Sequence, residues 1–119
     1  MSDARPWPLE LRLGHDKATL KVEFDSGESF ALAAEYLRVE SPSAEVQGHS
    51  ADQKQIVAGK RGVKIEAIEP VGNYAVRVRF DDGHDTGLYS WDYLHELGRD
   101  HAARWSAYLA ALKARKLER

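Results

Sequence analysis

The chain has 119 residues and a mass of 13.4 kDa, which is the size of a single domain. Hydrophobic residues make up 43% of it and charged residues 30%, a composition that excludes collagen-like, strongly disordered and disulfide-scaffold proteins. There is no cysteine, so this chain alone holds no disulfide, thiol nucleophile, cysteine-ligated zinc or iron–sulphur cluster. The formal net charge of -2 argues against a general nucleic-acid binder, and we expect no nucleic-acid partner.

Membrane and export signals are not found in the sequence. No stretch approaches the roughly 18 consecutive apolar residues that a membrane-spanning helix needs. Residues 1–8 contain no apolar run of the kind that forms a secretory signal. We therefore expect a cytoplasmic protein without a membrane partner.

Alternating apolar and polar side chains predict three strands early in the chain, over residues 9–13, 20–24 and 29–32. Residues 25–28 have turn chemistry, with Gly27 free to take a positive φ, so the last two strands form a hairpin. The pattern returns later in the chain: Val22, Phe24, Asp25, Gly27 and Leu32 correspond to Val78, Phe80, Asp81, Gly83 and Leu88. Either one strand–turn–strand–helix unit is used twice, or two hairpins resemble one another by convergence.

A further strand is predicted ahead of the second hairpin, over residues 63–68. In the strand that follows, over residues 74–80, Tyr74 shares the inward face with the apolar residues. Arg77 and Arg79 take the other face, where we expect Glu66 to lie opposite them.

Helices are predicted to close the chain. Ser90 is a good N-cap and Gly98 fits a C-terminal cap, and a second helix has the apolar spacing of Trp105, Tyr108, Leu109 and Leu112. The expected fold is α+β, a small antiparallel sheet of two related β-hairpin–helix units with a C-terminal amphipathic helix packed on it. We expect one domain, with a core over residues 9–112 and a basic tail over 113–119.

Charge is unevenly spread, because residues 99–119 carry +4 and residues 1–98 carry -6. Cations gather near a helix C-terminus because the dipole is negative there, which is one explanation. A tail that binds a partner is the other.

Known catalytic motifs do not match this chain. Gly59-Lys60 is followed by Arg61, so the phosphate-binding loop pattern fails. No two of the five histidines have the spacing that places both imidazoles on one helix face. The long polar connection over residues 40–62 is expected either to be functional or to contain a small element of its own.

The second hairpin carries residues with two interpretations each. His84 follows Asp81-Asp82-Gly83 and is either a pH-sensitive contact or a solvated turn histidine. Tyr89 and Trp91 are either interface residues or part of the core.

Five segments together resemble a known family, the gamma-butyrobetaine hydroxylase-like N-terminal domain, in its short stand-alone bacterial form. They are residues 37–45, 47–49, 68–74, 80–87 and 89–91. The resemblance extends from about Leu9 to Leu112.

In the hydroxylases this domain carries a structural zinc held by three cysteines and a histidine, and the resemblance places that set on Ser41, Ser43, Val46 and His84. Serine hydroxyls and a valine do not replace thiolate ligands. We therefore expect no cofactor and no bound metal, with His84 only a weak metal candidate. Hydrogen bonds from Ser41 and Ser43 are expected to hold the segment instead.

The resemblance also bears on function. The catalytic barrel of the hydroxylases is not part of this chain, and related domains occur joined to carriers of iron–sulphur clusters. The leading hypothesis is a non-catalytic accessory or adaptor domain that binds a protein partner, linked to iron–sulphur cluster delivery or to an oxygenase. The proposed contact residues are Arg38, Ser41, Ser43, His49, His84, Tyr89 and Trp91. The alternative is a metal- or small-ligand-binding protein that uses His84 with nearby carboxylates.

Overall fold

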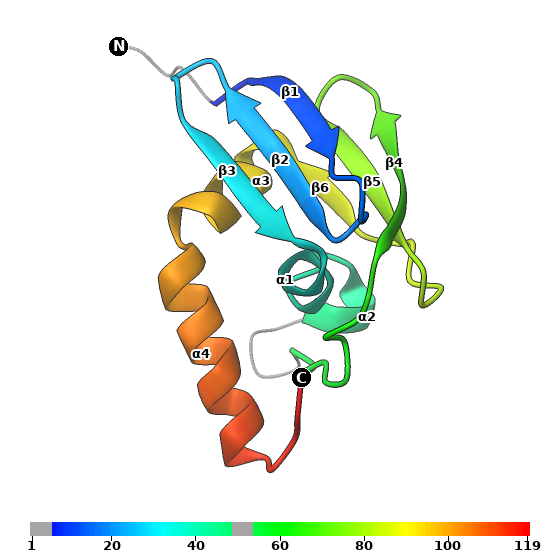
Figure 1. Cartoon of the computed structure of the whole chain (residues 1–119), viewed down its shortest axis with the longest axis vertical. Coiled ribbons are helices and arrows are strands. Elements are labelled where there is room, and N and C mark those ends of the chain that lie inside the picture. Colours follow the sequence, from blue (N-terminus) through cyan, green and yellow to red (C-terminus); the bar gives the residue numbers. More distant parts are fainter. Residues whose placement is uncertain (1–5, 49–53) are drawn as a thin grey trace.

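The computed structural model describes residues 6–48 and 54–119, and in them six strands and four helices follow one another (Figure 1). The strands are β1 Pro8–Leu13, β2 Thr19–Phe24, β3 Ser29–Ala33, β4 Ile65–Val71, β5 Ala75–Phe80 and β6 Leu88–Ser90. The helices are α1 Ala34–Val39, α2 Ala44–Gln47, α3 Trp91–Arg99 and α4 His101–Ala114. The α+β fold expected from the sequence is confirmed, with the strands divided between two antiparallel sheets of order β1-β2-β3 and β4-β5-β6.

The two sheets are built in the same way, each as three antiparallel strands followed by a helix. The turn glycines of the two hairpins also match, since φ is 91° at Gly27 and 92° at Gly83. Only glycine reaches this backbone region without strain, which explains the Asp-x-Gly turn in both copies. The strand–turn–strand–helix arrangement predicted from the sequence therefore occurs twice.

The pairing register of the second hairpin is one residue out of step with that of the first, and this changes which side chain points inward. Leu32 pairs with Leu20 in the first hairpin, whereas Tyr89 pairs with Val76 in the second. Tyr89 therefore takes the buried place that the sequence match gave to Leu88, and Leu88 is exposed.

The inward faces of both sheets, together with α1 and α3, form one hydrophobic core. Its largest fully buried side chains are Tyr36, Tyr89, Phe24, Phe80, Leu20, Leu32, Leu37, Ile65, Leu94 and Leu97. Burial of one such side chain contributes about 1.5–3 kcal/mol. A smaller cluster of Val39, Tyr108 and Leu112 joins α4 to α1. The C-terminal helix thus packs on α1 and on residues 56–58.

The prediction for the start of α3 is confirmed, and the prediction for its end is wrong. The Ser90 side chain accepts a hydrogen bond from the backbone N–H of Tyr93 at 3.1 Å, so Ser90 is the expected N-cap. Gly98 does not end the helix, which continues to Arg99. A Cβ at Gly98 would lie 2.3 Å from Cγ of Phe30, so glycine is needed here for the close approach of an aromatic ring.

The outer face of the second sheet carries an ion-pair cluster, and the glutamate predicted for it from the sequence was the wrong one. A β-bulge at residues 65–67 shifts the alternation of β4, so that Glu69 rather than Glu66 lies opposite Arg77. The Glu69 carboxylate lies 2.8 Å from Arg77 and 3.7 Å from Arg79.

The long connection contains a small element, as expected, because α2 forms behind an N-cap at Ser43. No strand forms over residues 55–57. In the part of the chain that the structure describes, no helix is both long enough and apolar enough to cross a membrane.

Candidate partner-binding site

Four side chains join the segment after α1 to the loop between β5 and β6. Ser41 Oγ lies 2.9 Å from Nε2 of His84, and Ser43 Oγ lies 2.7 Å from Oγ1 of Thr86. Ser41, Ser43 and His84 are all buried. We call these four residues the hydroxyl–imidazole cluster. The expectation that hydrogen bonds from Ser41 and Ser43 hold this segment is confirmed.

Glycine makes the approach of the two segments possible. A Cβ at Gly87 would lie 2.6 Å from Ser41 Oγ and 3.2 Å from the ring of Tyr89, both closer than ordinary contact. Ser41 Oγ also accepts a hydrogen bond from the backbone N–H of Ser43. A side chain at position 87 would therefore displace the hydroxyl on which this contact depends.

The surroundings of His84 favour its neutral form. Burial and the positive charge of Arg38 lower its pKa, and the nearby carboxylates of Glu45 and Asp82 oppose this only in part. Glu45 lies 3.2 Å from Nδ1 of His84 but is itself largely exposed, so its charge is screened by water. The environment of His84 thus favours a structural hydrogen-bonding role.

Beside the cluster, Asp82 joins α1 to the loop before β4. Its carboxylate accepts hydrogen bonds from Arg38 Nε at 2.8 Å and from the backbone N–H of His84 at 3.1 Å, and lies 2.6 Å from Lys60 Nζ. Burial raises the pKa of Asp82, but these donors outweigh it and lower the pKa to about 2. Nη1 of Arg38 is buried and has no hydrogen-bond partner among the described residues.

The residues at the zinc positions of the related hydroxylases do not fit zinc. Ser41 and Ser43 offer hydroxyls, Val46 is aliphatic and buried, and Nε2 of His84 is engaged by Ser41. Over residues 6–48 and 54–119, no three His, Cys, Asp or Glu side chains gather as a metal ion would require. The structure therefore gives this cluster a structural role in joining two segments.

Tyr89 belongs to the core, which corrects its assignment to a contact surface. Its side chain is fully buried, and its hydroxyl donates a hydrogen bond to the backbone carbonyl of Leu37. Burial raises its pKa, so it remains a neutral donor. Tyr93 makes the equivalent bond to the carbonyl of Glu40. Both tyrosines fix the position of α1 and the segment after it.

An exposed aromatic group lies at the other end of β5. Trp7 and Trp91 meet edge to face, with ring centroids 6.3 Å apart. Trp7 is 48% exposed and Tyr74 is 55% exposed, and both line a cavity of about 230 Å³ with Trp91. We call Trp7, Tyr74 and Trp91 the aromatic cluster.

The contact surface predicted from the sequence is thus divided. Trp91 lies beside Tyr74 at the start of β5, whereas His84 follows the end of β5. The six residues of β5 lie between the two, and a strand rises about 3.3 Å per residue. Arg38, Ser41, Ser43 and His84 do come together, but as a largely buried group. His49 lies outside the described residues.

Two members of the aromatic cluster were not predicted from the sequence. Tyr74 was assigned to the inward face, but Ala75 and Val76 are both buried, so the alternation breaks at the start of β5. In the sequence Trp7 stands between two prolines, and nothing there predicts that it lies next to Trp91.

These features define a small α+β domain of two related sheet–helix units whose connecting segments are held by a buried hydroxyl–imidazole cluster. A model of the family described as gamma-butyrobetaine hydroxylase-like, N-terminal, matches residues 11–95, and the chain belongs to this family. The resemblance noted in the sequence is confirmed.

Solved structures support the same assignment. Two solution structures determined by NMR are similar to this chain over 98% and 100% of its length, with TM-scores of 0.84 and 0.83 and identities of 41% and 47%. The chain covers 91% and 89% of those proteins. A crystal structure of a DUF971-family protein of unknown function from Acidithiobacillus ferrooxidans is 40% identical, with a TM-score of 0.67 over 82% of this chain and 98% of that one. The comparison with curated proteins found no match.

Proposed function

We propose that this chain is a non-catalytic accessory domain that binds a protein partner through the aromatic cluster. The observation that carries the proposal is the exposure of Trp7 and Tyr74 around a cavity that Trp91 completes. Aromatic side chains are enriched at protein interfaces, and tryptophan and tyrosine are the residues that most often dominate binding energy.

The aromatic cluster is held in place before any partner arrives. The backbone N–H of Trp91 donates to the carbonyl of Tyr74 at 3.1 Å, and its indole N–H donates to the carbonyl of Asn73 at 2.8 Å. The carbonyl of Trp7 accepts from the N–H of Asp25 at 2.9 Å. Binding to a preorganised surface loses little conformational entropy, which favours affinity.

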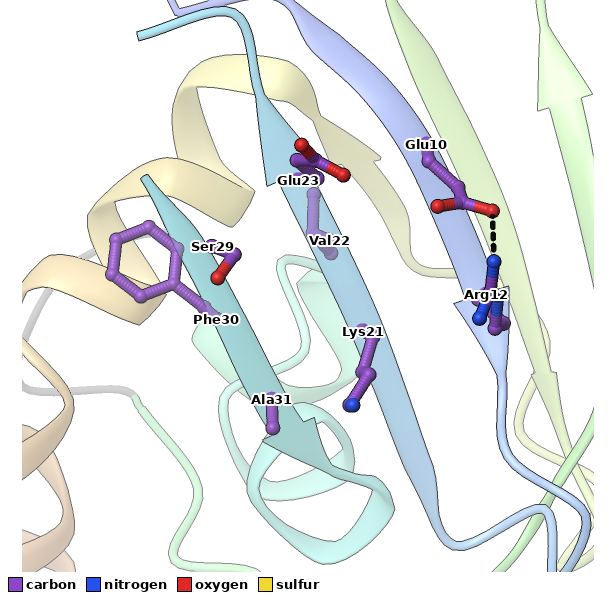
Figure 2. Close-up of a pocket in the computed structure, with 8 residues that line it drawn as sticks. All are labelled: Glu10, Arg12, Lys21, Val22, Glu23, Ser29, Phe30 and Ala31. Atoms are coloured by element: carbon purple, nitrogen blue, oxygen red, sulfur yellow. Dashed lines mark hydrogen bonds and ion pairs between the residues drawn. The ribbon is translucent and has the colours of Figure 1, made fainter. Parts of the chain in front are cut away.

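A second hollow, on the outer face of the first sheet, is less suited to a partner. It has a volume of about 420 Å³ and is lined by charged side chains of both signs, with Glu10 bonded to Arg12 (Figure 2). Lys21 and Glu23 also point away from the core there (Figure 2). Alternating charges on an open sheet face are readily solvated, and an exposed ion pair contributes little binding energy.

The family resemblance suggests which partners to test first. Oxygenases and carriers of iron–sulphur clusters are the two classes, and this chain would contribute docking rather than ligation because it has no cysteine. The alternative, a metal- or ligand-binding protein based on His84, is not supported by a specific contact, since the ring nitrogens of His84 meet Ser41 and Glu45.

The test compares capture by the intact chain with capture by a Trp7→Ala/Tyr74→Ala variant. Partners captured by the intact chain are identified, purified and titrated against both proteins. We expect the association constant to fall by about tenfold or more, which is typical when interface aromatic residues are removed. Leu88→Ala is the matched control, because Leu88 is exposed but does not line the cavity, and it should leave the constant unchanged. Equal binding by the folded double variant would refute the proposal.

A further inference from the structure

A basic surface with an apolar floor lies where the chain returns from α4. The last two turns of α4, the residues after it and Arg61 line a hollow of about 690 Å³. Its floor includes Leu109 and Leu117, which are 39% and 42% exposed. Leu109 and Leu117 are exposed large apolar residues outside the aromatic cluster, and they line the same hollow.

The segment that forms this surface is fixed to the body. After α4 the chain turns back toward α1 (Figure 1), and the backbone N–H of Leu117 donates to the carbonyl of Leu112 at 2.9 Å. The N–H of Gly59 donates to the carbonyl of Glu118 at 3.0 Å. Arg119 binds the buried carboxylate of Glu35 through Nε at 3.0 Å and Nη2 at 2.7 Å. The bond at the end of α4 and these two anchors to the body hold the side chains of the segment in a defined arrangement.

Three cations on this surface are not neutralised. Among the residues that the structure describes, Arg61, Lys113 and Lys116 take part in no ion pair. Arg119 is neutralised by Glu35, and Glu118 is the one acidic side chain in the lining of this hollow. The surface therefore has an excess of positive charge on a chain whose net charge is -2.

Lys116 occupies a backbone position that normally belongs to glycine. Its φ is 58°, and its N–H donates to the carbonyl of Lys113 at 3.1 Å, so it is the left-handed residue that ends α4. A side chain in this region costs about 1 kcal/mol relative to glycine. The backbone conformation at position 116 therefore favours glycine and does not explain the lysine side chain.

We propose that this surface, formed by Arg61, Lys113 and Lys116 around Leu109 and Leu117, docks an acidic amphipathic segment of a partner protein. Carboxylates of the segment pair with the three cations, and its apolar side chains cover the two leucines. The surface is separate from the aromatic cluster, so the two proposals fail independently.

The chemistry of the surface favours a protein segment over other polyanions. The lining has no aromatic side chain on which a nucleic-acid base could stack. Two exposed leucines offer less apolar area than the extended face that holds a helix in a membrane interface. The long Lys and Arg side chains can follow carboxylates on a helical segment.

The first test titrates the whole chain with a labelled helical peptide of Leu, Glu and Ala whose leucines follow the i, i+3, i+4 spacing. Fluorescence anisotropy reports binding, and amide chemical shifts locate it. We expect shifts at Leu109 and Leu117 and a loss of affinity of about tenfold in Lys113→Glu/Lys116→Glu, because close charge pairs are replaced by repulsion. Lys21→Glu, which changes an exposed charge on the first sheet, should have an effect of less than about twofold.

The second test separates recognition from folding. Lys116→Gly should raise the free energy of unfolding while it weakens peptide binding, a combination that a purely structural lysine would not give. Lys17 provides the matched control, because its φ is 59° and it lies in the turn between β1 and β2. Lys17→Gly should stabilise the chain to a similar extent and leave peptide binding unchanged.

Several outcomes would overturn the proposal. They are no saturable binding of the peptide, equal binding of a scrambled peptide of the same composition, and tighter binding of phosphatidylglycerol vesicles or of a single-stranded oligonucleotide. Loss of peptide binding with retained capture through the aromatic cluster would refute this inference and leave the proposed function standing.

Discussion

Replacing Gly87 with alanine should break the contact between the two sheet–helix units at one defined atom. The new Cβ would lie 2.6 Å from Ser41 Oγ, so the hydroxyl must rotate away or the loop must shift. Rotation removes the 2.9 Å hydrogen bond to Nε2 of His84, which is buried. We therefore expect Gly87→Ala to destabilise the fold through Ser41.

The size of the effect follows from two contributions. Leaving a buried polar group without its partner costs about 1–3 kcal/mol. Crowding a packed site costs about 1–3 kcal/mol, and the ring of Tyr89, 3.2 Å from the new Cβ, limits relaxation. We expect a total loss of about 2–6 kcal/mol in the free energy of unfolding, a large part of the stability of a domain of this size.

Urea unfolding of a double-mutant cycle tests this reasoning. Ser41→Ala already lacks the hydroxyl, so adding Gly87→Ala to it should cost at least about 1 kcal/mol less than in the intact chain. The matched control is Gly62→Ala, because a Cβ at Gly62 meets no atom within 4 Å and φ there is not positive. Additivity of Gly87→Ala and Ser41→Ala to within about 0.5 kcal/mol would refute the proposed coupling.

Three further predictions concern the rest of the fold. Gly98→Ala should destabilise the chain in urea, because crowding of Phe30 exceeds the gain in helix propensity of about 1 kcal/mol, and should become stabilising in a Phe30→Ala background. The contacts that lower the pKa of Asp82 stabilise the fold at pH values above the ordinary carboxylate pKa, and this stabilisation is lost as the pH falls through about 2. The stability difference between the intact chain and Asp82→Asn should therefore shrink by about 2 kcal/mol from pH 5 downward. An unchanged difference would contradict the ion-pair assignment. Arg104→Met should cost roughly 3 kcal/mol, because the buried carboxylate of Glu40 then keeps only Lys54; a loss below about 1 kcal/mol would show that the pair is not needed.

Local patterns in the sequence were sufficient for most of the fold. The alternation at residues 20–24 and the glycine turns predicted both hairpins, and Ser90 marked the start of α3 correctly. These features depend on neighbours along the chain, where the period of the side chains and the chemistry of caps act directly. The division of the strands into two sheets depends on contacts between distant segments and could not be read in this way.

The errors in the site have the same origin. The one-residue difference in the pairing register of the second hairpin moved Tyr89 inward and Leu88 outward, a shift that a five-position match does not resolve. Glycine at position 98 suggests the end of a helix when only the sequence is read. In the structure a Cβ there would collide with the ring of Phe30, which is distant in the sequence. Trp7 precedes β1 and Trp91 begins α3, so their contact depends on segments that are distant in the sequence.

The bonds of Ser41 and Ser43 have a practical consequence for anyone preparing the protein. These contacts are hydrogen bonds between side chains of the chain itself, and none of them needs an ion. Dialysis against a chelator should therefore leave the melting curve where it was, and growth in a zinc-depleted medium should yield the same folded product.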